Sequence, residues 1–164
     1  MKIYLVRHTE AIDYETESVR SDDLRFITPK GRKVAASIFK ALKEELNDLE
    51  KIFTSPLIRA VQTAEIMALT LKYKNDVEIA NELNISSTGN KVIQLLKRNS
   101  VFKSIALVGH EPMISGLVHE LSDNQDPAFT FKKAGVCCIE IDPEMGKGRF
   151  EWYYNPKTMV KVVS

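Results

Sequence analysis

The sequence predicts an α/β fold, a three-layer sandwich in which a mixed, mostly parallel sheet carries helices on both faces. Short apolar runs suited to buried strands alternate with segments whose apolar residues recur at helical spacing. The last two apolar runs are separated only by the turn "PEMGKG", which indicates an antiparallel pair. A length of 164 residues fits one core, so we expect a single domain over residues 1–164.

The apolar runs predict six strands. Crossover helices separate the early strands, which makes those strands parallel to one another. The expected strands are Ile3–Val6, Ile52–Thr54, Val77–Ala80, Ile105–Val108, Val136–Ile141 and Phe150–Tyr154.

Three helices are expected between these strands. The first begins at "TPKGR", where Thr28 is the N-cap and Pro29 the first helical residue. Its apolar positions share one face: Val34, Ala35, Ile38, Phe39, Leu42 and Leu46. The second begins at "SPLIR", with Ser55 as N-cap, and runs towards Leu71. The third begins at "HEPMI" and has its apolar residues on one side: Ile114, Leu117, Val118 and Leu121.

Composition excludes several classes of function. The formal net charge is +1, so no global basic field indicates nucleic acid binding. No apolar stretch approaches the roughly 20 residues that cross a bilayer. The run Ile3–Val6 is too short for a signal peptide and leads into charge. We therefore expect a cytoplasmic protein that binds neither nucleic acid nor membrane.

The two cysteines and one polar segment are interpreted as structural rather than catalytic. Cys137 and Cys138 are neighbours on an expected strand and point to opposite faces, so a disulfide between them would be strained. We expect both to be buried, apolar side chains in a reducing compartment. The polar segment from Glu10 to Leu24 is expected to be an exposed loop whose charges face solvent.

Histidine ends two of the expected strands: "IYLVRH" ends in His8 and "IALVGH" in His110. Ligands of open α/β sheets bind beyond the carboxyl ends of parallel strands, so neighbouring strands would direct both imidazoles at one small ligand. Arg7 precedes His8, and Arg59 lies in the first turn of the second helix, whose N-terminus favours an anion. These four side chains indicate an anion pocket for phosphoryl transfer without a metal or cofactor. His119, inside the third helix, is assigned a structural role.

The motifs "LVRHTEA", "TSPLIRAVQTAEI" and "LVGHEPMI" resemble those of the histidine phosphatase superfamily, whose fold is phosphoglycerate mutase-like. The whole chain resembles the compact SixA-like branch, the phosphohistidine phosphatases. The resemblance implies that His8 is the nucleophile and that Arg7, Arg59 and His110 hold the phosphoryl oxygens, His110 as a protonated donor. Arg25, in "LRFITPKG", matches a basic position of this branch and is either a substrate contact or a structural residue.

A general acid is the least defined part of the expected site. Family members that cleave phosphate esters use a carboxylic acid to protonate the leaving alkoxide, which contributes about 10²–10⁴ in rate. Glu82, in "ANELNISSTGN", is the candidate acid here unless it serves loop structure, and Glu10 is a distant second. Imidazole, the leaving group of phosphohistidine, has a pKa of about 6.5 and needs little help.

Thr9 departs from the Arg-His-Gly form of the first motif. A β-branched residue strains at positive φ, so we expect ordinary backbone angles after His8. The Thr9 side chain then either turns away from the phosphoryl group or offers it a hydroxyl as a substrate-binding residue.

The sequence favours a phosphatase that forms a covalent phosphohistidine and dephosphorylates phosphohistidine on a signalling or phosphotransfer protein. One alternative is a phosphomonoesterase for a small phosphorylated metabolite. A non-catalytic phosphate-binding module has no need of a nucleophile such as His8, and a mutase lacks room for its usual insertions. We expect a monomer.

Overall fold

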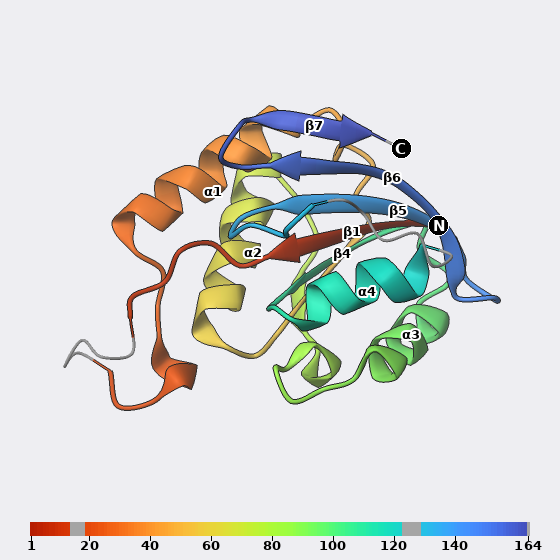
Figure 1. Cartoon of the computed structure of the whole chain (residues 1–164), viewed down its shortest axis with the longest axis horizontal. Coiled ribbons are helices and arrows are strands. Elements are labelled where there is room, and N and C mark those ends of the chain that lie inside the picture. The colour runs from red at the N-terminus through yellow and green to blue at the C-terminus, as the bar shows by residue number, and fades with distance from the viewer. Residues whose placement is uncertain (14–18, 123–128, 164) are drawn as a thin grey trace.

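The computed structural model describes residues 1–13, 19–122 and 129–163. One sheet of seven strands runs through it in the order β3-β2-β4-β1-β5-β6-β7 (Figure 1). The strands are β1 (Lys2–Arg7), β2 (Lys51–Thr54), β3 (Val77–Ile79), β4 (Ser104–Gly109), β5 (Val136–Asp142), β6 (Lys147–Asn155) and β7 (Val160–Val163). The first four are parallel, whereas β5, β6 and β7 each pair antiparallel with the strand before them in the order. The expectation of a mixed, mostly parallel sheet is confirmed for the part that carries the histidines.

Helices cover both faces of the sheet and complete the three layers (Figure 1). They are α1 (Pro29–Ala41), α2 (Ile58–Leu71), α3 (Gly89–Arg98) and α4 (Met113–Leu121), with short 3-10 turns at Asp22–Leu24 and Asn81–Leu83. Buried residues of α1 and α2 share one core cluster, and those of α3 and α4 share another. Strand β1 contributes to both, since Ile3 and Leu5 face the α3–α4 side while Tyr4 and Val6 face the α1–α2 side.

The start of α1 follows the sequence prediction closely. Thr28 is its N-cap, and the Thr28 hydroxyl accepts a hydrogen bond from the Gly31 backbone N–H at 2.9 Å. A Cβ on Gly31 would lie 2.3 Å from the Glu10 carbonyl oxygen, so only glycine permits this approach of helix and loop. The helix ends at Ala41, earlier than expected, and Leu46 is buried in the segment that follows it.

Two elements were not anticipated. Helix α3 lies between the third and fourth expected strands, where no helix was predicted, although Val92, Leu95 and Leu96 form a buried stripe at helical spacing. Strand β7 pairs with β6 at the edge of the sheet and is exposed along its length, so it has no alternation of buried residues. The cysteines behave as expected: both are free and buried, with Cys137 in one core cluster and Cys138 in the other.

Candidate active site

The register of two central strands brings the histidines together. Strands β1 and β4 are parallel neighbours in which Arg7 lies opposite Gly109, so the next residue of each strand is a histidine. The backbone N–H of His8 donates to the Gly109 carbonyl at 3.0 Å, which continues the pairing past the last strand residue. The two imidazole centroids lie 5.0 Å apart, and both rings are buried. The prediction that these strands deliver both rings to one place is confirmed.

The hydrogen bonding of His8 leaves a nucleophilic nitrogen. His8 Nδ1 lies 2.7 Å from the Thr9 carbonyl oxygen, and a carbonyl can only accept, so Nδ1 carries the proton and Nε2 keeps its lone pair. Burial first, and then the charges of His110, Arg59 and Arg7, lower the pKa of His8 to about 3 against the opposing effect of the Thr9 carbonyl. The ring is therefore neutral at physiological pH, which is the state required for attack on phosphorus.

Two arginines flank the histidines, as the sequence predicted. Arg59 is the second residue of α2 and only 4% exposed, and Arg7 is the last residue of β1. The Arg7 Nη1 donates to the Phe131 carbonyl at 2.7 Å, which ties the loop before β5 to the site. Both guanidinium charges lower the pKa of each histidine, which places all four side chains within electrostatic reach of one another.

Buried polar atoms without a partner concentrate at this point. Among the described residues, five side-chain nitrogen or oxygen atoms are buried with no hydrogen bond. Three of them are Arg7 Nε, Arg59 Nε and His110 Nδ1. Buried polar groups are almost always paired, so three unpaired nitrogens beside a neutral His8 mark a site for a ligand rich in acceptors. A phosphoryl group has such oxygens.

The state of His110 is set by its surroundings. Its Nε2 lies 2.7 Å from the Ser55 hydroxyl oxygen. Burial first and then Arg59 lower the pKa of His110 to about 4, although Asp22 opposes the shift. Without a bound anion the ring is therefore neutral near pH 7, and a protonated His110 beside a phosphoryl group stays a prediction. Ser55 was expected to cap the second helix, yet α2 begins at Ile58 with Leu57 as its N-cap. The Ser55 hydroxyl accepts from the Leu57 backbone N–H at 3.4 Å and also contacts His110 Nε2.

Asp22 is a site residue that the sequence analysis missed. Its carboxylate accepts from Arg59 Nη2 at 2.8 Å, and its backbone carbonyl accepts from Arg59 Nη1 at 2.8 Å. Partial burial raises the pKa of Asp22, but hydrogen bonds from Arg25 and Arg59 outweigh this and lower it. The Asp22 side chain is 41% exposed, so it faces solvent only in part and pairs with Arg59, unlike the expectation for the charges between Glu10 and Leu24. Residues 14–18 of that segment lie outside the described residues. No spacing signal in the sequence links Asp22 to a helix 37 residues away.

Arg25 supports Asp22 from the other side. Arg25 Nη1 donates to the Asp22 carboxylate at 3.0 Å, and Arg25 Nε donates to the Ile12 carbonyl at 2.6 Å. Arg25 thus contacts Asp22, which in turn contacts Arg59. A direct contact between Arg25 and substrate stays a prediction.

Thr9 turns away from the candidate pocket. Its hydroxyl donates to the Gly31 carbonyl at 2.9 Å, and its backbone N–H donates to the Thr63 hydroxyl at 3.2 Å. Thr9 is not among the residues with positive φ, as expected. With its hydroxyl proton committed to Gly31, Thr9 anchors the end of β1 to α1 and α2 and presents its carbonyl to His8. The idea that its hydroxyl binds substrate is not supported by this geometry.

Both candidate general acids are held by other side chains. Glu82 pairs with Arg98 of α3 at 2.5 Å, and hydrogen bonding to its own backbone N–H together with Arg98 lowers the pKa of Glu82. Glu10 accepts from the Thr28 hydroxyl at 2.8 Å, which lowers the pKa of Glu10. Both carboxylates are ionised at neutral pH and have no proton to give.

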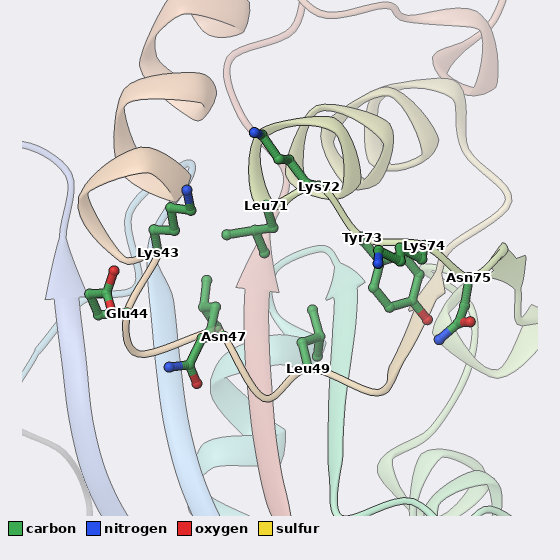
Figure 2. Close-up of a pocket in the computed structure, with 10 residues that line it drawn as sticks. Lys43, Glu44, Asn47, Leu49, Leu71, Lys72, Tyr73, Lys74 and Asn75 are labelled. Carbon is green, nitrogen blue, oxygen red and sulfur yellow. The ribbon is translucent and has the colours of Figure 1, made fainter.

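The opposite end of the sheet holds a separate hollow of about 330 Å³ (Figure 2). It lies beyond the C-terminal ends of α1 and α2, among Lys43, Leu49, Lys72, Tyr73 and Lys74. None of the predicted site residues lines it. In the described ranges no group of three or more His, Cys, Asp and Glu side chains is placed to hold a metal ion, and no helix there has the length and apolar character of a membrane span.

A family model of the histidine phosphatase superfamily (branch 1) matches residues 3–90, which is more than half of the chain and includes His8 and Arg59. The chain belongs to the histidine phosphatase superfamily. Its enzyme class is accordingly that of a phosphatase, a hydrolase.

Relatives within the superfamily match nearly the whole chain. The phosphohistidine phosphatase SixA of Escherichia coli (strain K12) is 27% identical over 158 residues, which cover 95% of this chain and 94% of SixA. A SixA homolog of Haemophilus influenzae is 30% identical, covering 77% of this chain and 80% of that protein. A solved structure of the protein histidine phosphatase SixA complexed with tungstate superposes with a TM-score of 0.86 at 26% identity, covering 98% of this chain and 100% of that one.

Proposed function

We propose that the protein removes the phosphoryl group from phosphohistidine on a protein substrate, through a covalent intermediate on His8. The observation that carries this proposal is the grouping of three buried, unpaired nitrogens around a neutral His8 whose Nε2 is free. A binding module would use the nitrogens but has no need of the free Nε2.

The reaction has two balanced steps. In the first, the Nε2 lone pair of His8 forms a bond to phosphorus while the P–N bond of the substrate breaks. The other nitrogen of the substrate ring already carries a proton, so the ring keeps that electron pair and leaves as neutral imidazole. In the second, a water molecule forms a P–O bond, the bond between His8 and phosphorus breaks, and a proton is lost to solvent. Orthophosphate and neutral His8 are the products.

The side chains around His8 suit both steps. Arg7 and Arg59 are fixed cations beside the ring, so they neutralise phosphoryl oxygen charge in each transition state without reorganising. A neutral His110 donates one hydrogen bond from whichever nitrogen carries its proton. When Ser55 donates to Nε2, that proton sits on Nδ1, the nitrogen without a partner. A bound phosphoryl dianion raises the pKa of His110 and strengthens this contact.

Leaving-group chemistry favours phosphohistidine over phosphate esters. A phosphohistidine ring protonated on its other nitrogen leaves as neutral imidazole, whose conjugate acid has a pKa of about 6.5, so it needs no acid from the enzyme. An alkoxide leaving group, by contrast, gains about 10²–10⁴ in rate from a general acid. The two carboxylates considered as acids are both ionised and paired elsewhere. The similar SixA proteins are named phosphohistidine phosphatases, and tungstate, bound in one of them, is a phosphate-like oxyanion. The fold alone does not distinguish phosphohistidine from a phosphate ester as the substrate, because a phosphoserine phosphatase of Entamoeba histolytica shares this fold with a TM-score of 0.68 at 18% identity.

A quench experiment tests the intermediate and a rate comparison tests the substrate. Brief reaction with radiolabelled phosphoramidate should leave acid-labile, alkali-stable label on His8, and the His8→Asn variant should take up none. Undiminished hydrolysis by His8→Asn would refute the mechanism. Turnover of a phosphohistidine peptide should exceed that of para-nitrophenyl phosphate and of sugar phosphates; the reverse order would establish the phosphomonoesterase alternative.

A further inference from the structure

A groove of about 420 Å³ adjoins the candidate site on the side of Arg7. Its charged lining consists of Arg7, Lys30, Lys132, Lys133 and Lys157 with one carboxylate, Glu10. We call it the lysine groove. Five cations and one anion give it a formal charge of +4, whereas the whole chain carries only +1. Positive charge is therefore gathered here and balanced elsewhere on the molecule.

The lysine groove is built onto the catalytic strand. Its lysines come from the first turn of α1, the loop before β5, and the connection between β6 and β7. The loop before β5 is held at both sides of its lysines, because Phe131 accepts from Arg7 Nη1 at 2.7 Å and the Ala134 N–H donates to the Arg7 carbonyl at 3.1 Å. Any movement of Lys132 and Lys133 relative to the phosphoryl site is thereby restricted.

Much of this charge is not neutralised by the chain itself. The Glu10 carboxylate lies 3.7 Å from Lys30 Nζ, and the charge of Lys133 also lowers the pKa of Glu10. Within residues 1–13, 19–122 and 129–163, no ion pair joins Lys132 or Lys157 to a carboxylate. Lys30, Lys133 and Lys157 are exposed, and Lys132 is half-buried.

We propose that the lysine groove docks the carboxylate-bearing surface that surrounds the phosphohistidine of the protein substrate. The proposal rests on the function proposed above and adds the chemistry of the partner: Asp and Glu side chains close to its phosphohistidine. Exposed lysines on flexible stems recognise loosely placed charges, unlike the fixed forks by which arginine binds one oxyanion. A basic surface beside the site also speeds encounter with an acidic partner. A small ligand would instead require buried, fixed donors of the kind found at Arg59.

Two phosphohistidine peptides of equal length test the docking surface, one with glutamates around the phosphohistidine and one with glutamines in their place. Wild-type kcat/KM should be higher for the glutamate peptide at low salt. The triple variant Lys132→Gln, Lys133→Gln, Lys157→Gln should lose about tenfold of kcat/KM toward the glutamate peptide and less than about twofold toward the glutamine peptide or phosphoramidate. The advantage of the glutamate peptide should vanish when salt shortens the Debye length to about 3 Å.

The hollow at the opposite end of the sheet supplies a matched control (Figure 2). Lys43, Lys72 and Lys74 are three exposed lysines that line it, so their triple change to glutamine alters the net charge by the same amount. This control should keep wild-type rates toward every substrate, which separates a local docking effect from the effect of overall charge. A loss of equal size in both triple variants would overturn the docking proposal.

Failure of the docking proposal is distinguishable from failure of the proposed function. Equal rates for the two peptides, in wild type and triple variant alike, would refute docking while leaving phosphohistidine hydrolysis intact. A loss in the triple variant confined to small substrates that carry a second anionic group would assign the groove to a small ligand and also overturn docking. Hydrolysis of neither peptide, with efficient hydrolysis of phosphomonoesters, would refute the proposed function itself.

Discussion

Acidification should weaken the fold through the two site histidines. In the folded protein burial holds the pKa of His8 at about 3 and that of His110 at about 4. An imidazole in the unfolded chain has a pKa of about 6.5. As the pH falls from about 7.5 to about 5, each of these imidazoles in the unfolded chain therefore takes up nearly one proton, whereas the folded rings stay neutral.

The expected loss follows from that difference in bound protons. Because the unfolded state binds more protons, the free energy of unfolding falls as pH falls, starting near pH 6.5 and continuing toward the folded pKa values. From about pH 7.5 to about pH 5 the loss is about 2 kcal/mol for each histidine, or about 4 kcal/mol together. The figure at pH 5 depends mainly on the unfolded pKa, since both folded rings stay neutral there. Most carboxylates lose stabilisation only at lower pH.

Urea denaturation of wild type and variants across this pH range measures the effect. His8→Asn and His110→Asn should each reduce the acid-dependent loss by about half, or about 2 kcal/mol. The double variant should show almost none of it. If the free energies of unfolding of wild type and His8→Asn differed by a constant amount from pH 7.5 to pH 5, the reasoning would be refuted. That result would mean that His8 binds its proton equally in the folded and unfolded states.

Three further substitutions probe the supports of the site. Gly31→Ala should cost about 1–3 kcal/mol of stability in urea denaturation because its Cβ would lie 2.3 Å from the Glu10 carbonyl oxygen. Its control, Gly116→Ala in α4, where nothing lies within 4 Å of the added Cβ, should gain about 0.5–1 kcal/mol, and equal effects would contradict the packing argument. Asp22→Ala should lower kcat/KM for phosphoramidate about tenfold by releasing Arg59, and Asp22→Asn less, since its amide oxygen still accepts a hydrogen bond; a gain would instead identify the carboxylate as a competitor of the phosphoryl group. Glu82→Gln should leave hydrolysis of phosphoramidate and of phosphomonoesters within about twofold of wild type, whereas a loss of about 10² or more on the esters alone would restore its role as an acid.

The histidine pair was predictable because its signal is local. Two apolar runs with the same ending, "VRH" and "VGH", need only be parallel neighbours for His8 and His110 to meet, and the register of β1 with β4 satisfies that condition. Arg59 was predictable for a similar reason, because the "SP" that precedes it indicates a helix N-terminus at the same end of the strands.

The contacts around these residues were not predictable because they join distant segments. Asp22 reaches Arg59 across 37 positions and Ser55 reaches His110 across 55, and neither distance corresponds to a period of helix or strand. The charge of His110 depends on its burial and on Arg59, which only the assembled structure supplies. Strand β7 is defined by its pairing with β6 and buries no face, so its sequence lacks the alternation that would have indicated it.

The direction of the strands has a practical consequence for immobilising this protein or fusing it to another domain. Strand β1 begins at the end of the sheet away from the histidines. Strand β7, antiparallel to β6, runs from the end that carries the histidines back toward that same far end. The start of β1 and the end of β7 accordingly lie at the same end of the sheet, away from the histidines, near the marked N and C in Figure 1. A biosensor surface, affinity handle or fused domain joined at either end would leave the face with His8 and the lysine groove turned toward the solution, where a large phosphorylated protein can reach it.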